Sequence, residues 1–183
     1  MFAADARGMF AALGADELTR TSLFIPAEQM KSKALGLQLG AHVYPWRGQS
    51  MAFGIGAETV MAGNSFETVD TTTLKPTGTI YNRRLRDLSG QLSLNFGHKS
   101  GWSYITAGIG SMTFESYLDK LQPDGLAQSA INYGAGARWY TYDHLAFTLD
   151  LRFYATQPTP ATANTAPRLR HAVFVMSAGV SIK

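Results

Sequence analysis

The chain has 183 residues, enough for one domain, and its apolar residues (45%) form no run of about 18 that could make a membrane-spanning helix. The absence of cysteine excludes disulfides and thiolate metal sites. A net charge of +3 could indicate nucleic acid, but the basic residues fall in predicted loops rather than on one face with interleaved aromatics, so we expect no nucleic-acid partner.

The first segment has the weakest pattern of the chain. Asp5 interrupts what would otherwise resemble the start of a secretory signal, and the apolar stretch Met9–Ala15 is at the short limit of about 7 residues. We therefore expect either an export signal upstream of Met1 or a chain that is not exported. Gly8–Ala15 is interpreted as a weak first strand, with a short helix left open, and residues 8–31 as this strand and a loop.

Seven clearer strands follow, each with apolar residues on one face and glycine, amide or charged residues on the other. They cover residues 32–44, 51–61, 88–97, 102–114, 129–141, 145–154 and 171–183. Each is close to the roughly 9 to 11 residues that a tilted strand needs to cross a bilayer.

The connections alternate in length. Those after the second, fourth and sixth strands are short, whereas residues 8–31, 62–87, 115–128 and 155–170 contain longer polar loops. In an up-and-down meander this places all short turns at one end, which is typical of outer-membrane barrels with short periplasmic turns and long external loops. The predicted fold is all-β, an eight-stranded antiparallel up-and-down transmembrane β-barrel, with residues 1–183 forming one domain.

Glycines alternate with apolar residues in these strands. In a soluble calycin-like barrel that binds an apolar ligand they would lie on the outer surface, where glycine weakens a strand without benefit. In a transmembrane barrel they would line the narrow lumen and make room for larger side chains. The second arrangement is favoured by Gly36, Gly40, Gly54, Gly56, Gly108, Gly110, Gly134 and Gly136.

All three tryptophans lie beside the short turns, and tyrosines accompany them. Amphipathic rings favour the interface between membrane and water. The pattern predicts a periplasmic aromatic belt of Trp46, Trp102, Trp139, Tyr44, Tyr104 and Tyr142.

Residues 132–154, NYGAGARWYTYDHLAFTLDLRFY, form two alternating strands joined by a turn of a few residues. With the similar hairpins around it, this run resembles the small outer-membrane β-barrel proteins of the outer-membrane protein A and X type. The resemblance implies an eight-stranded antiparallel barrel inserted from the periplasm. The chain departs from the family at Ser181-Ile182-Lys183, where its members usually end on an aromatic residue.

Four charged residues are expected in the lumen: Glu58, Arg138, Asp150 and Arg152. Because an unpaired buried charge costs several kcal/mol, we expect Glu58 to pair with Arg152 and Arg138 to pair with Asp150. This cluster could be the gate of a pore, but an eight-stranded interior is usually filled, which favours a polar plug.

Basic residues gather at the predicted outer strand ends, where they could pair with lipopolysaccharide phosphates or remain solvated. These are Lys31, Lys33, Arg83, Arg84, Arg86, Arg168 and Arg170. No metal-ligand spacing, nucleotide-binding loop or catalytic triad is recognised, so neither cofactor nor catalysis is expected.

The sequence thus predicts a protein of the cell outer membrane with outer-membrane lipid as its environment and a structural or surface-interaction role. A small low-conductance pore and a soluble calycin-like barrel are the alternatives. The loop partner and the oligomeric state stay open.

Overall fold

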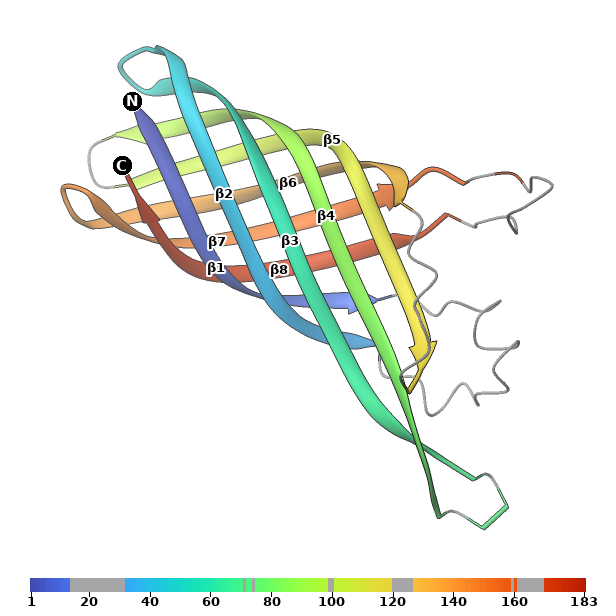
Figure 1. Cartoon of the computed structure of the whole chain (residues 1–183). Helices are drawn as coiled ribbons and strands as arrows, with labels where there is room; N and C mark the ends of the chain where they lie inside the picture. Colours follow the sequence, from blue (N-terminus) through green and yellow to red (C-terminus); the bar gives the residue numbers. More distant parts are fainter. Residues whose placement is uncertain are drawn as a thin grey trace.

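The computed structural model describes residues 1–13, 32–70, 72–73, 75–98, 101–119, 127–158, 160 and 170–183. Its strands are β1 (Phe2–Leu13), β2 (Lys33–Arg47), β3 (Met51–Val69), β4 (Pro76–His98), β5 (Gly101–Leu118), β6 (Ala127–Tyr142), β7 (Leu145–Thr156) and β8 (Ala172–Ile182). Each strand pairs antiparallel with its sequence neighbours, and β8 pairs with β1 to close the barrel (Figure 1). The predicted eight-stranded antiparallel barrel is confirmed. Within the described ranges, no helix is long and apolar enough to cross a membrane.

The first strand begins earlier than predicted. β1 starts at Phe2 rather than Gly8, and Ala4 pairs with Ala41 of β2 and with Ile182 of β8. The prediction treated Asp5 as a break in an apolar segment, whereas it lies on the inward face of a strand with two faces. The last residues of the predicted strand, Gly14 and Ala15, lie outside the described residues.

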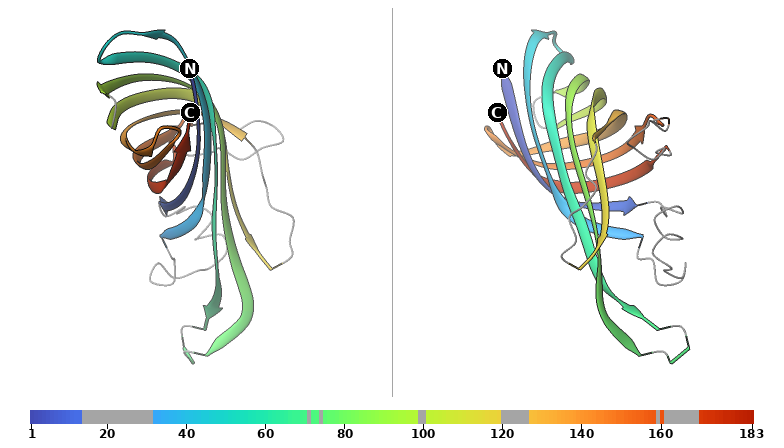
Figure 2. Two further views of the ribbon diagram at one scale, coloured as in Figure 1. Left: turned by 90° about the vertical axis from the view of Figure 1, so that its left-hand side faces the viewer. Right: turned by 45° about the vertical axis from the view of Figure 1, so that its right-hand side comes forward.

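The predicted external loops are too long. Most of residues 62–87 belong to β3 and β4, which remain paired from Asn64–Arg83 to Val69–Pro76. The two strands extend beyond the rest of the barrel as a hairpin, as both views in Figure 2 show. Residues 115–118, 127–128 and 155–156 are also strand rather than loop. The apolar face is interrupted in the β3–β4 extension, for example by Arg83, but pairing of the backbone does not require a continuous one.

Asp70 orders the tip of this hairpin. Its Oδ1 accepts hydrogen bonds from the backbone N–H groups of Thr72 (2.9 Å) and Thr73 (2.7 Å) and from the Thr73 hydroxyl (3.0 Å). These donors stabilise the carboxylate and lower its pKa below the usual value.

The two faces of the barrel have opposite character. Large apolar side chains point outward along all eight strands, whereas charged and amide side chains are buried inside. The chain termini and the short β2–β3, β4–β5 and β6–β7 connections lie at one end of the barrel, here called the short-turn end (Figure 1). The opposite end is the loop end. A soluble barrel that binds an apolar ligand would need the reverse distribution, so the arrangement of side chains argues against that alternative.

Glycines in the lumen make room for rings. A Cβ on Gly136 would clash with the Tyr104 hydroxyl, and one on Gly54 would clash with the Tyr44 ring. Gly54 and Gly136 therefore each lie beside a tyrosine ring of a neighbouring strand.

Candidate functional site

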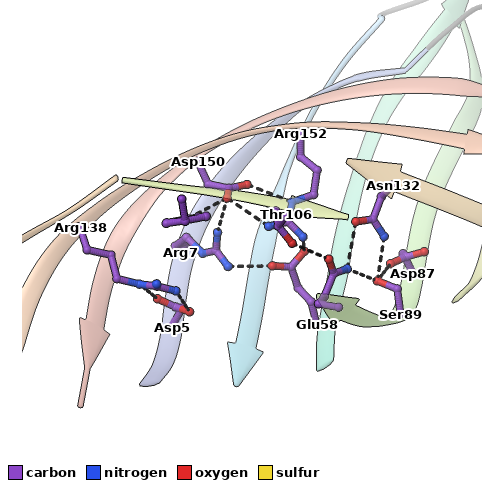
Figure 3. A network of polar contacts seen from close by, with 12 residues as sticks. Asp5, Arg7, Glu58, Asp87, Ser89, Thr106, Asn132, Arg138, Asp150 and Arg152 are labelled. Atoms are coloured by element: carbon purple, nitrogen blue, oxygen red, sulfur yellow. Dashed lines mark hydrogen bonds and ion pairs between the residues drawn. The ribbon is translucent and has the colours of Figure 1, made fainter. Parts of the chain in front are cut away.

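The lumen contains an ionic network of three arginines and three carboxylates. It comprises Asp5 and Arg7 of β1, Glu58 of β3, Arg138 of β6, and Asp150 and Arg152 of β7 (Figure 3). Each of these residues is at most 4% exposed. The formal charges balance, as burial requires.

Glu58 lies at the centre of the network. Its Oε1 accepts hydrogen bonds from Arg152 Nη1 (2.5 Å) and the Tyr154 hydroxyl (3.0 Å), and its Oε2 accepts one from Arg7 Nη2 (2.8 Å). The structure therefore brings together Glu58 and Arg152, as expected from the sequence.

Asp150 joins the same two arginines from the other side. Its Oδ2 lies 3.1 Å from both Arg152 Nη2 and Arg7 Nη1, and it accepts a hydrogen bond of 2.8 Å from the Tyr104 hydroxyl. Arg7 and Arg152 are thus each held by two carboxylates.

The predicted pairing of Arg138 with Asp150 is wrong. Arg138 Nε and Nη2 instead donate to Asp5 Oδ1 (3.1 Å) and Oδ2 (2.8 Å), a bidentate pair across the lumen. Its Nη1 donates to the Tyr44 hydroxyl (3.1 Å) and to Asn95 Oδ1 (3.3 Å). Because β1 begins six residues early, it supplies a carboxylate that the sequence-based pairing lacked.

Arg7 was missed for the same reason as Asp5. One signal was available: Ala4, Ala6, Gly8 and Phe10 alternate with Asp5, Arg7 and Met9, which is the pattern of a strand with a polar inner face.

A chain of neutral polar groups extends the network toward β4, β5 and β6 (Figure 3). Gln91 Nε2 donates to Ser89 Oγ (2.8 Å) and Asn132 Oδ1 (3.0 Å), and Thr106 Oγ1 donates to Gln91 Oε1 (3.0 Å). Ser89 Oγ in turn donates to Asp87 Oδ2 (2.9 Å).

Apolar layers flank the polar network on both sides. Toward the loop end, the lumen is filled by buried side chains that include Leu13, Val60, Leu85, Met112 and Val175, here called the outer layer. At the short-turn end, the inner layer consists of Ala3, Tyr44, Ala52 and Trp102, with Tyr140 packed against them. The guanidinium of Arg47 stands 5.6 Å from the Trp102 ring, and Lys183 Nζ stands 4.0 Å from that of Tyr140.

The predicted aromatic belt is wrong for half of its members. Trp46 (55% exposed), Trp139 (46%) and Tyr142 point outward, and Trp139 stacks on Phe147 with a ring separation of 6.0 Å. In contrast, Tyr44, Trp102 and Tyr104 are buried in the lumen. Tyr44, Trp102 and Tyr104 occupy inward positions of their strands. The alternation of side chains along the strand therefore outweighs the preference of aromatic rings for the membrane interface.

The predicted basic residues also divide between the two faces. Lys33, Arg84, Arg86 and Arg170 are exposed. Arg83 is instead buried, with its guanidinium 5.1 Å from the Phe114 ring, so it cannot contact lipid directly. Lys31 and Arg168 lie outside the described residues.

Over the portions of the chain that the structure describes, no group of three or more His, Asp and Glu side chains could hold a metal ion.

A closed eight-stranded antiparallel barrel with an apolar exterior and a charged interior has the fold of the small outer-membrane β-barrels. No protein-family model and no curated protein matches the sequence. Solved structures that are similar include Neisserial surface protein A (NspA), with a TM-score of 0.63 and 11% identity over 100% of this chain and 96% of that one. Ail, the attachment invasion locus protein of Yersinia pestis, has a TM-score of 0.55 and 11% identity over 99% of this chain and 98% of that one. At these identities the similarity shows the fold alone.

Proposed function

We propose that the protein is an outer-membrane β-barrel with a sealed lumen, and that it has a structural or surface-interaction role without catalysis. In this proposal the short-turn end faces the periplasm and the loop end faces the cell exterior. The strands anchor the chain in lipid, and the surface beyond them meets the partners.

The observation that carries the proposal is the inverted distribution of side chains. Outward positions such as Leu35, Leu92 and Ile109 are exposed apolar residues, whereas six charged residues are paired inside. In water this exterior would be an aggregation hazard, but in a bilayer it is the stable arrangement.

The sealed lumen is supported by the order of its layers. The ionic network lies between the outer and inner layers, so an ion crossing the lumen has to pass buried apolar side chains on both sides of the network. Desolvation at such a constriction opposes conduction.

A small low-conductance pore is the second candidate. It is favoured by buried polar atoms of Gln38, His42, Thr148 and Ser177 that have no hydrogen-bond partner among the described residues. Water molecules in the lumen would satisfy them, and a continuous file of water could conduct.

Two experiments test the membrane assignment. The untagged protein is expected in the outer-membrane fraction, and unboiled detergent samples are expected to migrate differently from boiled ones because a closed barrel resists unfolding. A protein that is monodisperse in water without detergent would contradict the assignment.

Planar-bilayer recording separates the sealed barrel from the pore. We expect no steady unitary current for the wild type, for Glu58→Gln or for Arg152→Gln, because both apolar layers remain in place. A steady conductance that changes with either substitution would establish the pore instead.

A further inference from the structure

Three exposed cations form a patch on the outward face of the barrel near its loop end. The cationic patch consists of Lys33 of β2 and Arg84 and Arg86 of β4. Across the sheet, Gly63 of β3 pairs with both Leu35 and Arg84, and Met61 pairs with both Leu37 and Arg86. Across the sheet, the three cations thus lie within two strand spacings of one another, which is roughly 10 Å. Along the strands they are separated by at most two pleats, that is, four residues.

The patch adjoins the end of the apolar exterior. Leu35 (73% exposed) follows Lys33 by two residues, and Leu88 (65% exposed) follows Arg86 by two. On both strands the outward positions therefore change from apolar to cationic toward the loop end, on β4 after Leu88 and on β2 two pleats further along, after Leu35. In a membrane barrel such a change marks the border between the hydrocarbon and the lipid headgroups.

The cations of the patch differ from those of the lumen in their described partners. Within the described part of the chain, none of the three forms an ion pair, in contrast to Arg7, Arg138 and Arg152 in the lumen. The Arg84 guanidinium stands 5.4 Å from the Tyr117 ring, and Lys33 Nζ stands 6.0 Å from the Phe10 ring. Such contacts orient a cation without neutralising it.

One carboxylate has to be weighed against this charge. Glu115 of β5 is the sheet neighbour of Arg84, but it is 8% exposed and its Oε2 has no hydrogen-bond partner among the described residues. Counting Glu115 as ionised, the patch keeps a net charge of +2.

Neighbouring groups add hydrogen-bonding capacity. Ser65 and Asn82 are paired sheet neighbours directly beyond Gly63 and Arg84, and the Ser65 hydroxyl lies 2.7 Å from Asn82 Oδ1. Gly63 itself has no side chain, and the Arg84 Cγ lies 3.7 Å from the place that a Cβ would take, so the stem of Arg84 borders this position.

We propose that the cationic patch binds phosphate groups of lipopolysaccharide in the outer leaflet; this rests on the proposed outer-membrane location. Phosphate is the anion found at headgroup level, and the planar fork of arginine matches its oxygens. The patch would therefore fix the barrel to one class of lipid rather than to the bilayer in general.

The test compares the folded full-length barrel in detergent with the double variant Arg84→Gln/Arg86→Gln. The affinity for purified lipopolysaccharide is measured by titration, with the same lipopolysaccharide treated with phosphatase as a second probe. We expect the double variant to bind at least about 10-fold more weakly, and dephosphorylation to weaken binding of the wild type similarly.

Lys75→Gln is the matched control. It removes one positive charge from the exposed tip of the same β3–β4 hairpin, away from the patch, and is expected to leave the affinity unchanged. Heat-modifiable mobility of each variant verifies that the barrel is folded, so loss of binding cannot be confused with misfolding.

Several results would overturn the proposal. These are unchanged affinity in the double variant, equal binding of dephosphorylated lipopolysaccharide, or equal binding of a sulfated polysaccharide. Because binding is measured in detergent, these results are distinct from failure of the barrel to reach the outer membrane, which would refute the proposed function.

Discussion

The bidentate pair between Asp5 and Arg138 is expected to contribute strongly to stability. Both side chains are at most 4% exposed, and the two hydrogen bonds measure 3.1 and 2.8 Å. Asp5→Asn removes the charge with little change in shape and leaves a buried guanidinium with only neutral partners, Tyr44 and Asn95. Removing one member of a buried pair typically costs about 3 to 5 kcal/mol, whereas an exposed pair is worth about 0 to 1 kcal/mol.

Urea unfolding in lipid vesicles, followed by the band shift of unboiled samples, measures this cost. Asp5→Asn and Arg138→Gln are each expected to lower the free energy of unfolding by about 3 to 5 kcal/mol, and the double variant by clearly less than the sum, since no uncompensated charge remains. Asp119→Asn, an exposed position, is the control. Single-variant costs below about 1 kcal/mol, or strict additivity, would refute the assignment of Asp5 to the lumen.

In the same unfolding assay, Gly136→Ala should destabilise the barrel by about 1 to 3 kcal/mol, because the new Cβ would clash with the Tyr104 hydroxyl. Gly8→Ala is the control and should be neutral or stabilising, since the nearest atom to its Cβ would be 3.9 Å away. Equal costs for the two substitutions would contradict this packing. Brominated lipid should quench the tryptophan fluorescence of the wild type. The double variant Trp46→Phe/Trp139→Phe retains only Trp102, which is buried in the lumen, and should be nearly unquenched. Strong quenching of this variant would place Trp102 on the outer face. NMR titration should give the Asp70 carboxyl a pKa below the usual aspartate range, because Thr72 and Thr73 donate hydrogen bonds to it. Its contribution to hairpin order is then present above the pKa of the unfolded state and is lost as the pH falls through the pKa of the folded state. An ordinary aspartate pKa would exclude these hydrogen bonds.

Strand alternation predicted the architecture of the barrel because one face of each strand had to be apolar. It gave seven strands near their observed places and the inward direction of Glu58, Arg138, Asp150 and Arg152. The contact of Glu58 with Arg152 was accessible from topology, since β3 and β7 lie opposite each other in an eight-stranded barrel.

The remaining features depend on information that local patterns do not contain. The partner of Arg138 is Asp5, 133 residues away in sequence, and its role depends on closure of β8 on β1. The sequence predicts a loop where the long β3–β4 hairpin lies, because this stretch is polar, rich in Thr and Asn, and contains Pro76-Thr77-Gly78. Tyr44, Trp102 and Tyr104 were assigned by residue type, although their positions in alternating strands already pointed inward.

Arginine has two different roles in this barrel, and its partners distinguish them. Arg7, Arg138 and Arg152 each contact carboxylates in the lumen, so their substitution should change the free energy of unfolding and leave surface binding intact. Arg84 and Arg86 have no such partners within the described residues, so their substitution should leave unfolding nearly unchanged. If the cationic patch binds lipid phosphate, the cost of losing these two charges appears only when the anion is present. Stability and binding measured on the same variants therefore separate the charges that fill the lumen from those that face the outer leaflet.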